Sequence, residues 1–174
     1  MKRFDGFPIF SGLSAAEVER VLDGSEDVAF RPNERIFEKG DPCDGFYIIH
    51  EGAIEIRRRD LNGGGEVRVA LLSRPSVFGE MSLIAERPRS AAAVAVEAAR
   101  LTKIPKRGFV ELLDAGDLAG FKVIRAFARI VTERLKVTEE QLLGMLREVG
   151  VEKREKKLAE LQAFRQKLFN EWSF

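Results

Sequence analysis

The sequence predicts a mainly β protein, a jelly-roll-like β-barrel with flanking helices, followed by a long C-terminal helix and a helical tail. From about residue 28 to residue 104, apolar and polar residues alternate in short runs separated by glycine-containing turns. Alternation with a period of two is typical of half-buried antiparallel strands. About eight such strands without helices between them favour a closed β architecture over an α/β fold. Apolar residues with helical spacing follow only after the β region.

The chain begins with a short helix that is predicted by its start signal. Ser14 and Glu17 have the spacing of a capping box, in which the serine side chain accepts from the first turn and the glutamate reaches back to the serine backbone. Val18, Val21 and Leu22 then mark one apolar face. We therefore expect a helix that starts after Ser14 and turns this face inward.

One hairpin is the clearest part of the β region. Apolar and polar residues alternate over residues 54–57 and again over residues 67–71. The run Asn-Gly-Gly-Gly at 62–65 lies between them and tolerates positive φ angles, so it predicts the turn of a β-hairpin. Gly40 and Gly52 mark further turns.

Two helices are predicted after the β region, at residues 106–113 and at about 117–146. The first turns of the longer helix carry apolar residues at helical spacing, which predicts packing on the barrel. Further along, the spacing of apolar residues alternates between four and three, which is typical of a coiled-coil seam and favours a parallel homodimer. An amphipathic helix that packs on its own barrel is the alternative. The seam consists of Val131, Leu135, Thr138, Leu142, Met145 and Val149.

The domain prediction divides the chain into residues 1–148, which hold the N-terminal helix, the barrel and the long helix, and an amphipathic helical tail at 149–174. The tail has a single apolar stripe, so we expect one helix that packs on the barrel, on a second subunit or on a protein partner. A helix-turn-helix with its supporting elements needs about 60 residues or more. Only 24 residues follow Gly150, so no DNA binding is expected unless the sequence is a fragment of a longer regulator. The stripe consists of Leu158, Leu161, Phe164, Leu168 and Trp172.

Composition and charge argue against several classes of function. Lys and Arg number 29 and Asp and Glu 28, so the net charge of +1 provides no bulk attraction to nucleic acid. No apolar run reaches the about 18 residues of a membrane span, and no signal-peptide core follows the first residues, so we expect a cytoplasmic protein. The single cysteine, Cys43, cannot form an internal disulfide. The single histidine, His50, cannot complete a metal site or a nucleophile–base pair, so neither metal binding nor catalysis is expected.

The most specific motif comprises residues 78–84, Phe-Gly-Glu-Met-Ser-Leu-Ile, and residues 87–91, Arg-Pro-Arg-Ser-Ala. Gly79 lacks a Cβ and opens a short helical turn, so its backbone N–H groups can approach an anion closely. The planar guanidinium of Arg89 can pair with two phosphate oxygens, and the carboxylate of Glu80 can accept from a ribose hydroxyl. The motif therefore predicts a site for a compact sugar phosphate. The alternative is that Glu80 and Arg89 only pair with each other.

These residues resemble the phosphate-binding cassette of the cyclic-nucleotide-binding domain family, which includes catabolite activators and regulatory subunits of protein kinase A. The resemblance covers roughly residues 7–146. It implies that Glu80 takes the ribose 2′-hydroxyl and Arg89 the cyclic phosphate. It also implies main-chain contacts to the phosphate and side chains that either face the ribose and base or belong to the core. The main-chain contacts are Gly79, Ser82 and Ser90; Ile56 and Val69 would face the ribose and base, and Ala91 would follow the phosphate site.

The long helix resembles the segment that covers the base in the catabolite-activator branch of that family. The resemblance rests on residues 135–140, Leu-Lys-Val-Thr-Glu-Glu. It implies that Thr138 hydrogen-bonds the exocyclic amine of adenine, unless Thr138 is only a tolerated seam residue. That branch has a serine at the next position, which contacts the nucleotide of the other subunit, whereas this chain has Glu139. Ser90 fits both cAMP and cGMP, and Thr138 favours cAMP.

The resemblance therefore implies a cytoplasmic cyclic-nucleotide sensor that binds cAMP rather than cGMP and signals through its C-terminal helices to a protein partner. No cofactor besides this ligand is expected. Larger dinucleotide ligands stay open. The alternative function is a ligand-free oligomerisation or scaffold module of the same fold, against which the presence of both Glu80 and Arg89 argues.

Overall fold

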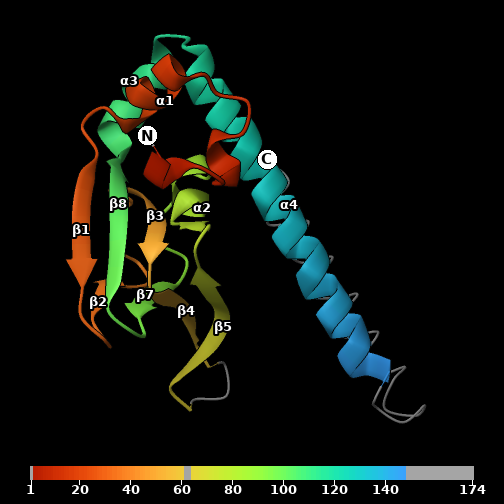
Figure 1. Cartoon of the computed structure of the whole chain (residues 1–174). Helices are drawn as coiled ribbons and strands as arrows, with labels where there is room; N and C mark the ends of the chain where they lie inside the picture. Colours follow the sequence, from red (N-terminus) through yellow and green to blue (C-terminus); the bar gives the residue numbers. More distant parts are fainter. Residues whose placement is uncertain (1, 61–63, 148–174) are drawn as a thin grey trace. The chain divides into compact units, whose positions relative to one another are not determined.

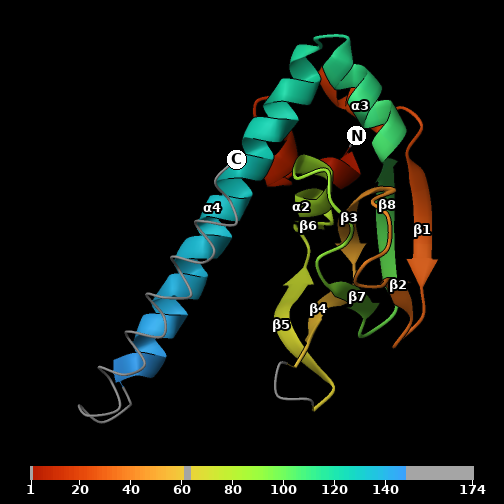
Figure 2. The same ribbon diagram turned by 180° about the vertical axis from the view of Figure 1, so that it is seen from behind.

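Two antiparallel sheets form the centre of the structure, a computed structural model that describes residues 2–60 and 64–147 (Figure 1, Figure 2). The described strands are β1 Glu26–Phe30, β2 Arg35–Phe37, β3 Gly45–Glu51, β4 Ala53–Arg59, β5 Glu66–Ser73, β6 Val77–Phe78, β7 Ala92–Ala95 and β8 Ala99–Pro105. The first sheet has the order β1-β8-β3-β6 and the second the order β2-β7-β4-β5. Neighbours in each sheet are mostly distant in sequence, as in a jelly roll.

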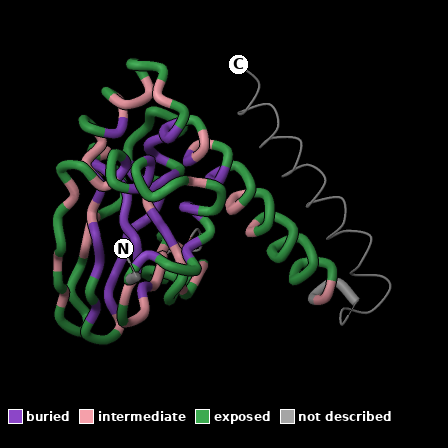
Figure 3. Tube along the Cα trace, turned by 45° about the horizontal axis from the view of Figure 1, so that its top comes forward, coloured by how far each residue is buried: buried purple, intermediate pink, exposed green. Residues whose placement is uncertain are grey.

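Both sheets contribute to one apolar core. Tyr47 and Ile49 of β3, Phe78 of β6 and Leu101 of β8 come from the first sheet, and Ile54 of β4 comes from the second. Each of these side chains is at most 4% exposed. In Figure 3 buried and exposed stretches alternate along the β region of the trace. The predicted fold, a jelly-roll-like β structure with flanking helices, is confirmed.

The predicted hairpin is confirmed by the strands on either side of its turn. β4 and β5 pair antiparallel from Ala53 opposite Ser73 to Arg59 opposite Glu66. At the end of the hairpin the Asp60 amide donates to the Gly65 carbonyl at 2.8 Å. Alternating apolar residues and a glycine-rich turn therefore predicted this pairing correctly.

The helices are α1 Ala15–Leu22, α2 Glu80–Ile84, α3 Lys106–Asp114 and α4 Leu118–Arg147, and two 3-10 turns, Lys2–Phe4 and Pro8–Phe10, precede them. The two predicted C-terminal helices thus occur within one or two residues of their expected bounds. Both ribbon views place α1 and α3 beside the first turns of α4 (Figure 1, Figure 2).

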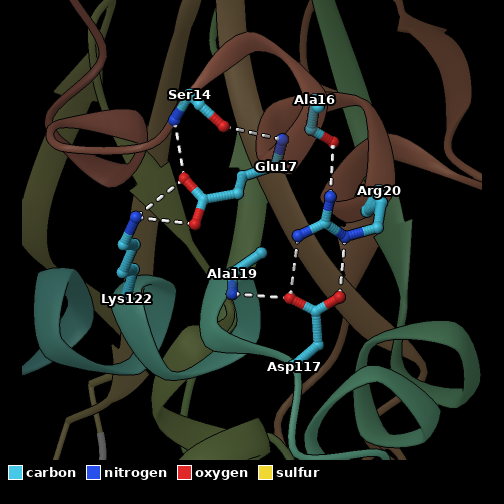
Figure 4. A network of polar contacts seen from close by, with 7 residues as sticks. All are labelled: Ser14, Ala16, Glu17, Arg20, Asp117, Ala119 and Lys122. Atoms are coloured by element: carbon cyan, nitrogen blue, oxygen red, sulfur yellow. Dashed lines mark hydrogen bonds and ion pairs between the residues drawn. The ribbon is translucent and has the colours of Figure 1, made fainter.

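A polar network fastens α1 to the start of α4 (Figure 4). Ser14 caps α1 as predicted: its amide donates to Glu17 Oε2 at 2.7 Å, and its Oγ accepts from the Glu17 amide. The same Glu17 carboxylate accepts from Lys122 of α4 at 2.6 and 2.7 Å. Arg20 forms two hydrogen bonds, of 2.6 and 3.1 Å, to the carboxylate of Asp117. The capping box therefore also supplies one of two ion pairs between the helices.

Aromatic side chains pack these helices on the outer face of the first sheet. The ring of Phe46 on β3 meets Phe109 of α3 and Phe127 of α4 edge to face, with centroid distances of 5.5 and 5.0 Å. All three rings are at most 2% exposed. The predicted packing of the first turns of α4 on the barrel follows from this cluster.

The chain divides by its internal contacts into residues 1–128 and 129–174, and α4 contributes to both units. In the second unit, residues 129–147 are helical and several large apolar side chains are exposed, among them Leu135 at 60% (Figure 3). The predicted tail at 149–174 lies outside the described residues, so the domain division stays a prediction. Among the described helices, none is both long and apolar enough to cross a membrane.

His50 ties the N-terminal segment to the first sheet. Its ring meets those of Phe4 and Phe7 at centroid distances of 5.2 and 5.5 Å. Its Nε2 lies 2.7 Å from Thr102 Oγ1, and that hydroxyl donates to Asp27 Oδ1 at 2.9 Å. Because a carboxylate only accepts, the single hydroxyl hydrogen is used there, and His50 Nε2 must carry the hydrogen that Thr102 accepts. His50 is thus hydrogen-bonded within the first sheet.

We predict that protonation of His50 weakens the fold below neutral pH. Burial lowers the pKa of His50, and the charge of Arg3 acts in the same direction. The unfolded chain therefore binds the proton more readily, so stability is complete above about pH 6.5, the ordinary histidine value, and falls as pH drops toward the lowered pKa. Urea unfolding of wild type and His50→Gln between pH 5 and 7.5 tests this. The variant should have the flatter profile, and parallel profiles would contradict the prediction.

Candidate functional site

The predicted phosphate cassette runs from the end of β6 through α2 to the start of β7. Gly79, between β6 and α2, has φ of 84°, in the left-handed region where residues with a Cβ are strained. A Cβ at this position would lie 2.6 Å from Nη1 of Arg89. Glu80 follows as the first residue of α2 and is 1% exposed. A glycine is therefore needed both for the turn and for the approach of the arginine.

The guanidinium of Arg89 is buried and held from several sides. Only 2% of Arg89 is exposed. Its Nη1 donates to the Gly79 carbonyl at 2.9 Å, and its Nη2 donates to the Gly45 carbonyl at 2.7 Å and to Asp44 Oδ1 at 2.6 Å. The guanidinium carbon also lies 4.2 Å from the ring centroid of Phe37, a cation–π distance. These contacts fix the plane of the guanidinium, and Asp44 supplies a carboxylate that pairs with it.

One donor of Arg89 is left without an acceptor. Its Nε is buried and forms no hydrogen bond. An unsatisfied buried donor costs about 1–3 kcal/mol, and more on a charged group. An anion acceptor such as a phosphate oxygen would satisfy it. The arginine side chain is therefore rigidly held and has a free N–H donor, as expected of a group that binds an anion.

The loop before β3 is part of the same site. The Arg89 amide donates to the Asp41 carbonyl, and the Gly40 amide donates to the Arg89 carbonyl, both at 2.8 Å. Asp44, at the end of this loop, also accepts from Lys103 of β8 at 2.6 Å. Burial raises the pKa of the Asp44 carboxyl, but hydrogen bonds from Lys103 and Arg89 outweigh it and hold that pKa below its ordinary value. Asp44 is therefore a charged bridge between two cations.

The remaining cassette residues differ in exposure. Ser82 is 5% exposed, and its hydroxyl donates to the Pro88 carbonyl at 3.4 Å across the loop. Ser90 is exposed, and Ala91 is 7% exposed. Arg87 is exposed, as expected of a solvated loop charge. Ser90, which directly follows the buried Arg89, is therefore open to solvent, whereas Ser82 and Ala91 are buried.

A bulge in β5 interrupts the alternation at Val69. Ile56 of β4, which packs against the core, pairs with Ala70, but the next residue of β4 pairs with Arg68, so Val69 is an extra residue. Arg68 donates to Glu55 at 3.2 Å, and Glu55 neighbours Ile56 on the opposite, outer face. Ala70 therefore lies opposite Ile56 on the inner face, and the extra residue Val69 beside it is 53% exposed.

β7 connects these two groups of residues. It begins directly after Ala91, and its Ala93 pairs with Ile56. β4 is thus the neighbour of the strand that follows Arg89, and β5 lies one strand further on. The structure in this way brings Ile56 and Val69 to the neighbourhood of the cassette.

Comparison with known proteins agrees with this arrangement. The family described as "Cyclic nucleotide-binding domain" matches residues 27–115. The chain belongs to this family. Because the matched segment runs from β1 through α3, it contains all of the strands and the whole cassette.

Individual relatives come from bacteria and fungi. The chain is 34% identical to the "Cyclic AMP receptor protein" of Thermus thermophilus over 74% of its own length and 59% of the relative. It is 36% identical to a "cAMP-dependent protein kinase regulatory subunit" of Mycosarcoma maydis over 65% of its length and 22% of the relative. The crystal structure of the Thermus thermophilus Catabolite Activator Protein has a TM-score of 0.65 at 31% identity, over 79% of this chain and 62% of that one. This chain thus spans under two thirds of each of these relatives.

Sequence reasoning missed two residues that form ion pairs around Arg89. Asp44 forms an ion pair with Arg89, and Lys103 forms a second ion pair with Asp44. No sequence pattern assigned a role to either residue. Asp44 stands directly before Gly45, whose carbonyl also accepts from Arg89. An acidic residue beside a glycine that precedes a strand was the signal available, but it is common in turns.

Thr138 lies in the second unit. Its hydroxyl donates to the Arg134 carbonyl at 2.8 Å, four residues earlier in α4. The hydroxyl oxygen keeps acceptor capacity, which is what an exocyclic amine requires. Its contact with a base stays a prediction.

We predict that Gly79→Ala destabilises the protein more than an equivalent change elsewhere. Gly24 also has a positive φ, 68°, but no atom lies within 4 Å of the position that a methyl group would take there. Gly24→Ala should lose about 1–2 kcal/mol from backbone strain alone. Gly79→Ala should lose about 1–3 kcal/mol more, because the new methyl displaces Arg89 from buried acceptors. Urea unfolding measures both, and equal losses would show that Arg89 moves without cost.

Proposed function

We propose that this chain is a cyclic-nucleotide sensor in which Arg89 binds the cyclic phosphate and Glu80 the ribose 2′-hydroxyl. The observation that carries the proposal is the buried Nε of Arg89, a charged donor without an acceptor in an otherwise fixed guanidinium. Membership of the family supports the class of ligand. The burial of Glu80 next to Gly79 supports a shared site for phosphate and ribose.

The other predicted contacts complete the proposed site. Backbone amides of Gly79, Ser82 and Ser90 would face the phosphate. Ile56 and Val69 would cover the ribose and base from the second sheet, in which Val69 is the extra residue of the bulge in β5 and is 53% exposed. Ala91 would follow the phosphate contact and lead into β7. No metal or further cofactor is part of this proposal.

Among cyclic nucleotides we propose cAMP rather than cGMP. The relatives described as a cyclic AMP receptor protein and as cAMP-dependent kinase subunits support this choice, as does the acceptor offered by Thr138. The fold alone does not decide it. A structure with a TM-score of 0.66 and 24% identity is described as the regulatory subunit of a cAMP-independent protein kinase A from Trypanosoma brucei.

For the signal we propose a population shift in α4. Ligand would favour the arrangement in which Thr138 contacts the base, and the C-terminal helices would report this change to a protein partner. The apolar seam of α4 would join two copies of the chain as a cytoplasmic homodimer. The exposed Leu135 supports an association of this kind.

Calorimetric titration with cAMP and cGMP tests the ligand. Arg89→Ala should weaken binding by about 10- to 100-fold, because one charge-assisted pair is lost. Arg87→Ala is the matched control, since Arg87 is two residues away and exposed. It should bind like wild type, and circular dichroism should verify that Arg89→Ala is folded.

Three results of this titration would decide between the alternatives. If folded, ligand-free wild type takes up neither nucleotide, the chain is a scaffold module or binds another ligand. If Arg89→Ala binds like wild type, the phosphate lies elsewhere. If Thr138→Ala leaves the preference for cAMP over cGMP unchanged, Thr138 does not contact the base.

Sedimentation velocity tests the homodimer. Leu135→Glu should raise the dimer dissociation constant about tenfold or more, because a large apolar side chain is lost from the seam in both copies. Lys136→Glu, one residue off the seam and exposed, should have little effect. A wild-type protein that sediments as a monomer at tens of micromolar, or equal effects of the two substitutions, would refute the seam.

A further inference from the structure

Lys103 reaches the phosphate site from an unexpected strand. It lies on β8 opposite Tyr47 of β3, so its side chain shares the inner face with the Tyr47 ring. That ring is 4% exposed, and its centroid lies 5.9 Å from the guanidinium carbon of Arg89. Lys103 is therefore the second cation on the inner side of the first sheet near the cassette.

Asp44 is shared between these two cations. Its Oδ1 accepts from Arg89 and its Oδ2 accepts from Lys103, each at 2.6 Å. The exposed fractions of the three side chains are 1% for Arg89, 23% for Lys103 and 48% for Asp44. One carboxylate thus serves one fully buried and one mostly buried cation, and this group of three charges has a net charge of +1.

A carboxylate that is shared by two cations neutralises the charge of each cation less than a carboxylate that pairs with one cation alone. The hydrogen bond that Lys103 donates to Asp44 raises the pKa of Lys103, so the lysine stays charged over the physiological range. While Lys103 holds Oδ2, the field of Asp44 on an anion near Arg89 is partly cancelled. Without Lys103, the full negative charge of Asp44 would oppose that anion and pair with Arg89 alone.

We propose that Lys103 is a positioning residue for the cyclic phosphate, which it favours by engaging Asp44 and so leaving the positive charge of Arg89 available. The proposal rests on the proposed function of Arg89. Lys103 acts through Asp44 and does not itself contact the ligand.

The test is a double-mutant cycle of cAMP affinity measured by calorimetry. Lys103→Met should weaken binding about fivefold, the size of a partly exposed charge interaction. In an Asp44→Asn background, where the amide oxygen can still accept from Arg89, the same substitution should weaken binding by less than about twofold. Equal losses in both backgrounds would show that Lys103 attracts the phosphate directly, and would overturn the proposal.

Two further variants separate charge from packing. Lys103→Arg should restore most of the affinity because it keeps a cation beside Asp44. Arg100→Met, on the same strand but 71% exposed and paired with Glu51, removes the same charge away from Asp44 and should bind like wild type. Failure of Lys103→Arg to restore binding, or an equal loss in Arg100→Met, would refute the role.

A ligand-free measurement makes the outcome independent of the nucleotide. Carbon-detected NMR titration of the Asp44 carboxyl should give a higher pKa in Lys103→Met than in wild type, because one of the two groups that stabilise the carboxylate is lost. An unchanged pKa would show that Lys103 does not share Asp44 with Arg89.

The two proposals fail in different ways. If the titration shows that Asp44 pairs with Lys103 in the wild type but the wild type binds no cyclic nucleotide, the proposed function fails. If wild type binds cAMP and Lys103→Met binds it equally well, only this inference fails.

Discussion

The site depends on the burial of one cation, the guanidinium of Arg89. Removing a charge from water is costly unless partners replace the lost hydration. Here the partners are two backbone carbonyls and one carboxylate, from Gly79, Gly45 and Asp44. Both residues that supply carbonyls are glycines, for different reasons: a Cβ on Gly79 would meet the guanidinium, and one on Gly45 would lie 2.3 Å from the Ile104 carbonyl. The arginine thus explains Gly79, and the close approach of β8 explains Gly45.

These partners come from separate parts of the sandwich. Gly79 follows β6 directly, Asp44 and Gly45 lie at the start of β3, and the lysine that shares Asp44 lies on β8. β3 is hydrogen-bonded to both β6 and β8, so one sheet fixes all of them relative to one another. The arginine itself arrives on the loop before β7, in the other sheet. The jelly roll therefore allows a single buried charge to be compensated from the ends of two strands, β6 and β3, while β8 adds the lysine that shares Asp44, and the ion chain in turn links the two sheets.

A feature could be predicted from the sequence when the residues that form it lie close together along the chain. The cassette could be predicted because Gly79, Glu80 and Arg89 lie within one short segment whose residue types have direct chemical meaning. The hairpin could be predicted because alternation and turn chemistry are local. The bulge at Val69 could not, because strict alternation over residues 67–71 was assumed, whereas register depends on the partner strand. The pairing of Asp44 with Lys103 depends in the same way on strand order, which no local pattern contains.

The charge count around Arg89 also bears on whether this fold binds a ligand at all. A sandwich in which two carboxylates faced the arginine would neutralise it, and an anion would gain nothing by entering. A sandwich with no carboxylate would leave a buried charge with too few partners to fold well. In the contacts described for Arg89, one carboxylate is divided between two cations: the arginine is compensated enough to be buried, and Arg89 and Lys103 together outnumber the carboxylate that they share. Because the whole chain has a net charge of only +1, attraction of a phosphate must come from such a local excess rather than from the overall field.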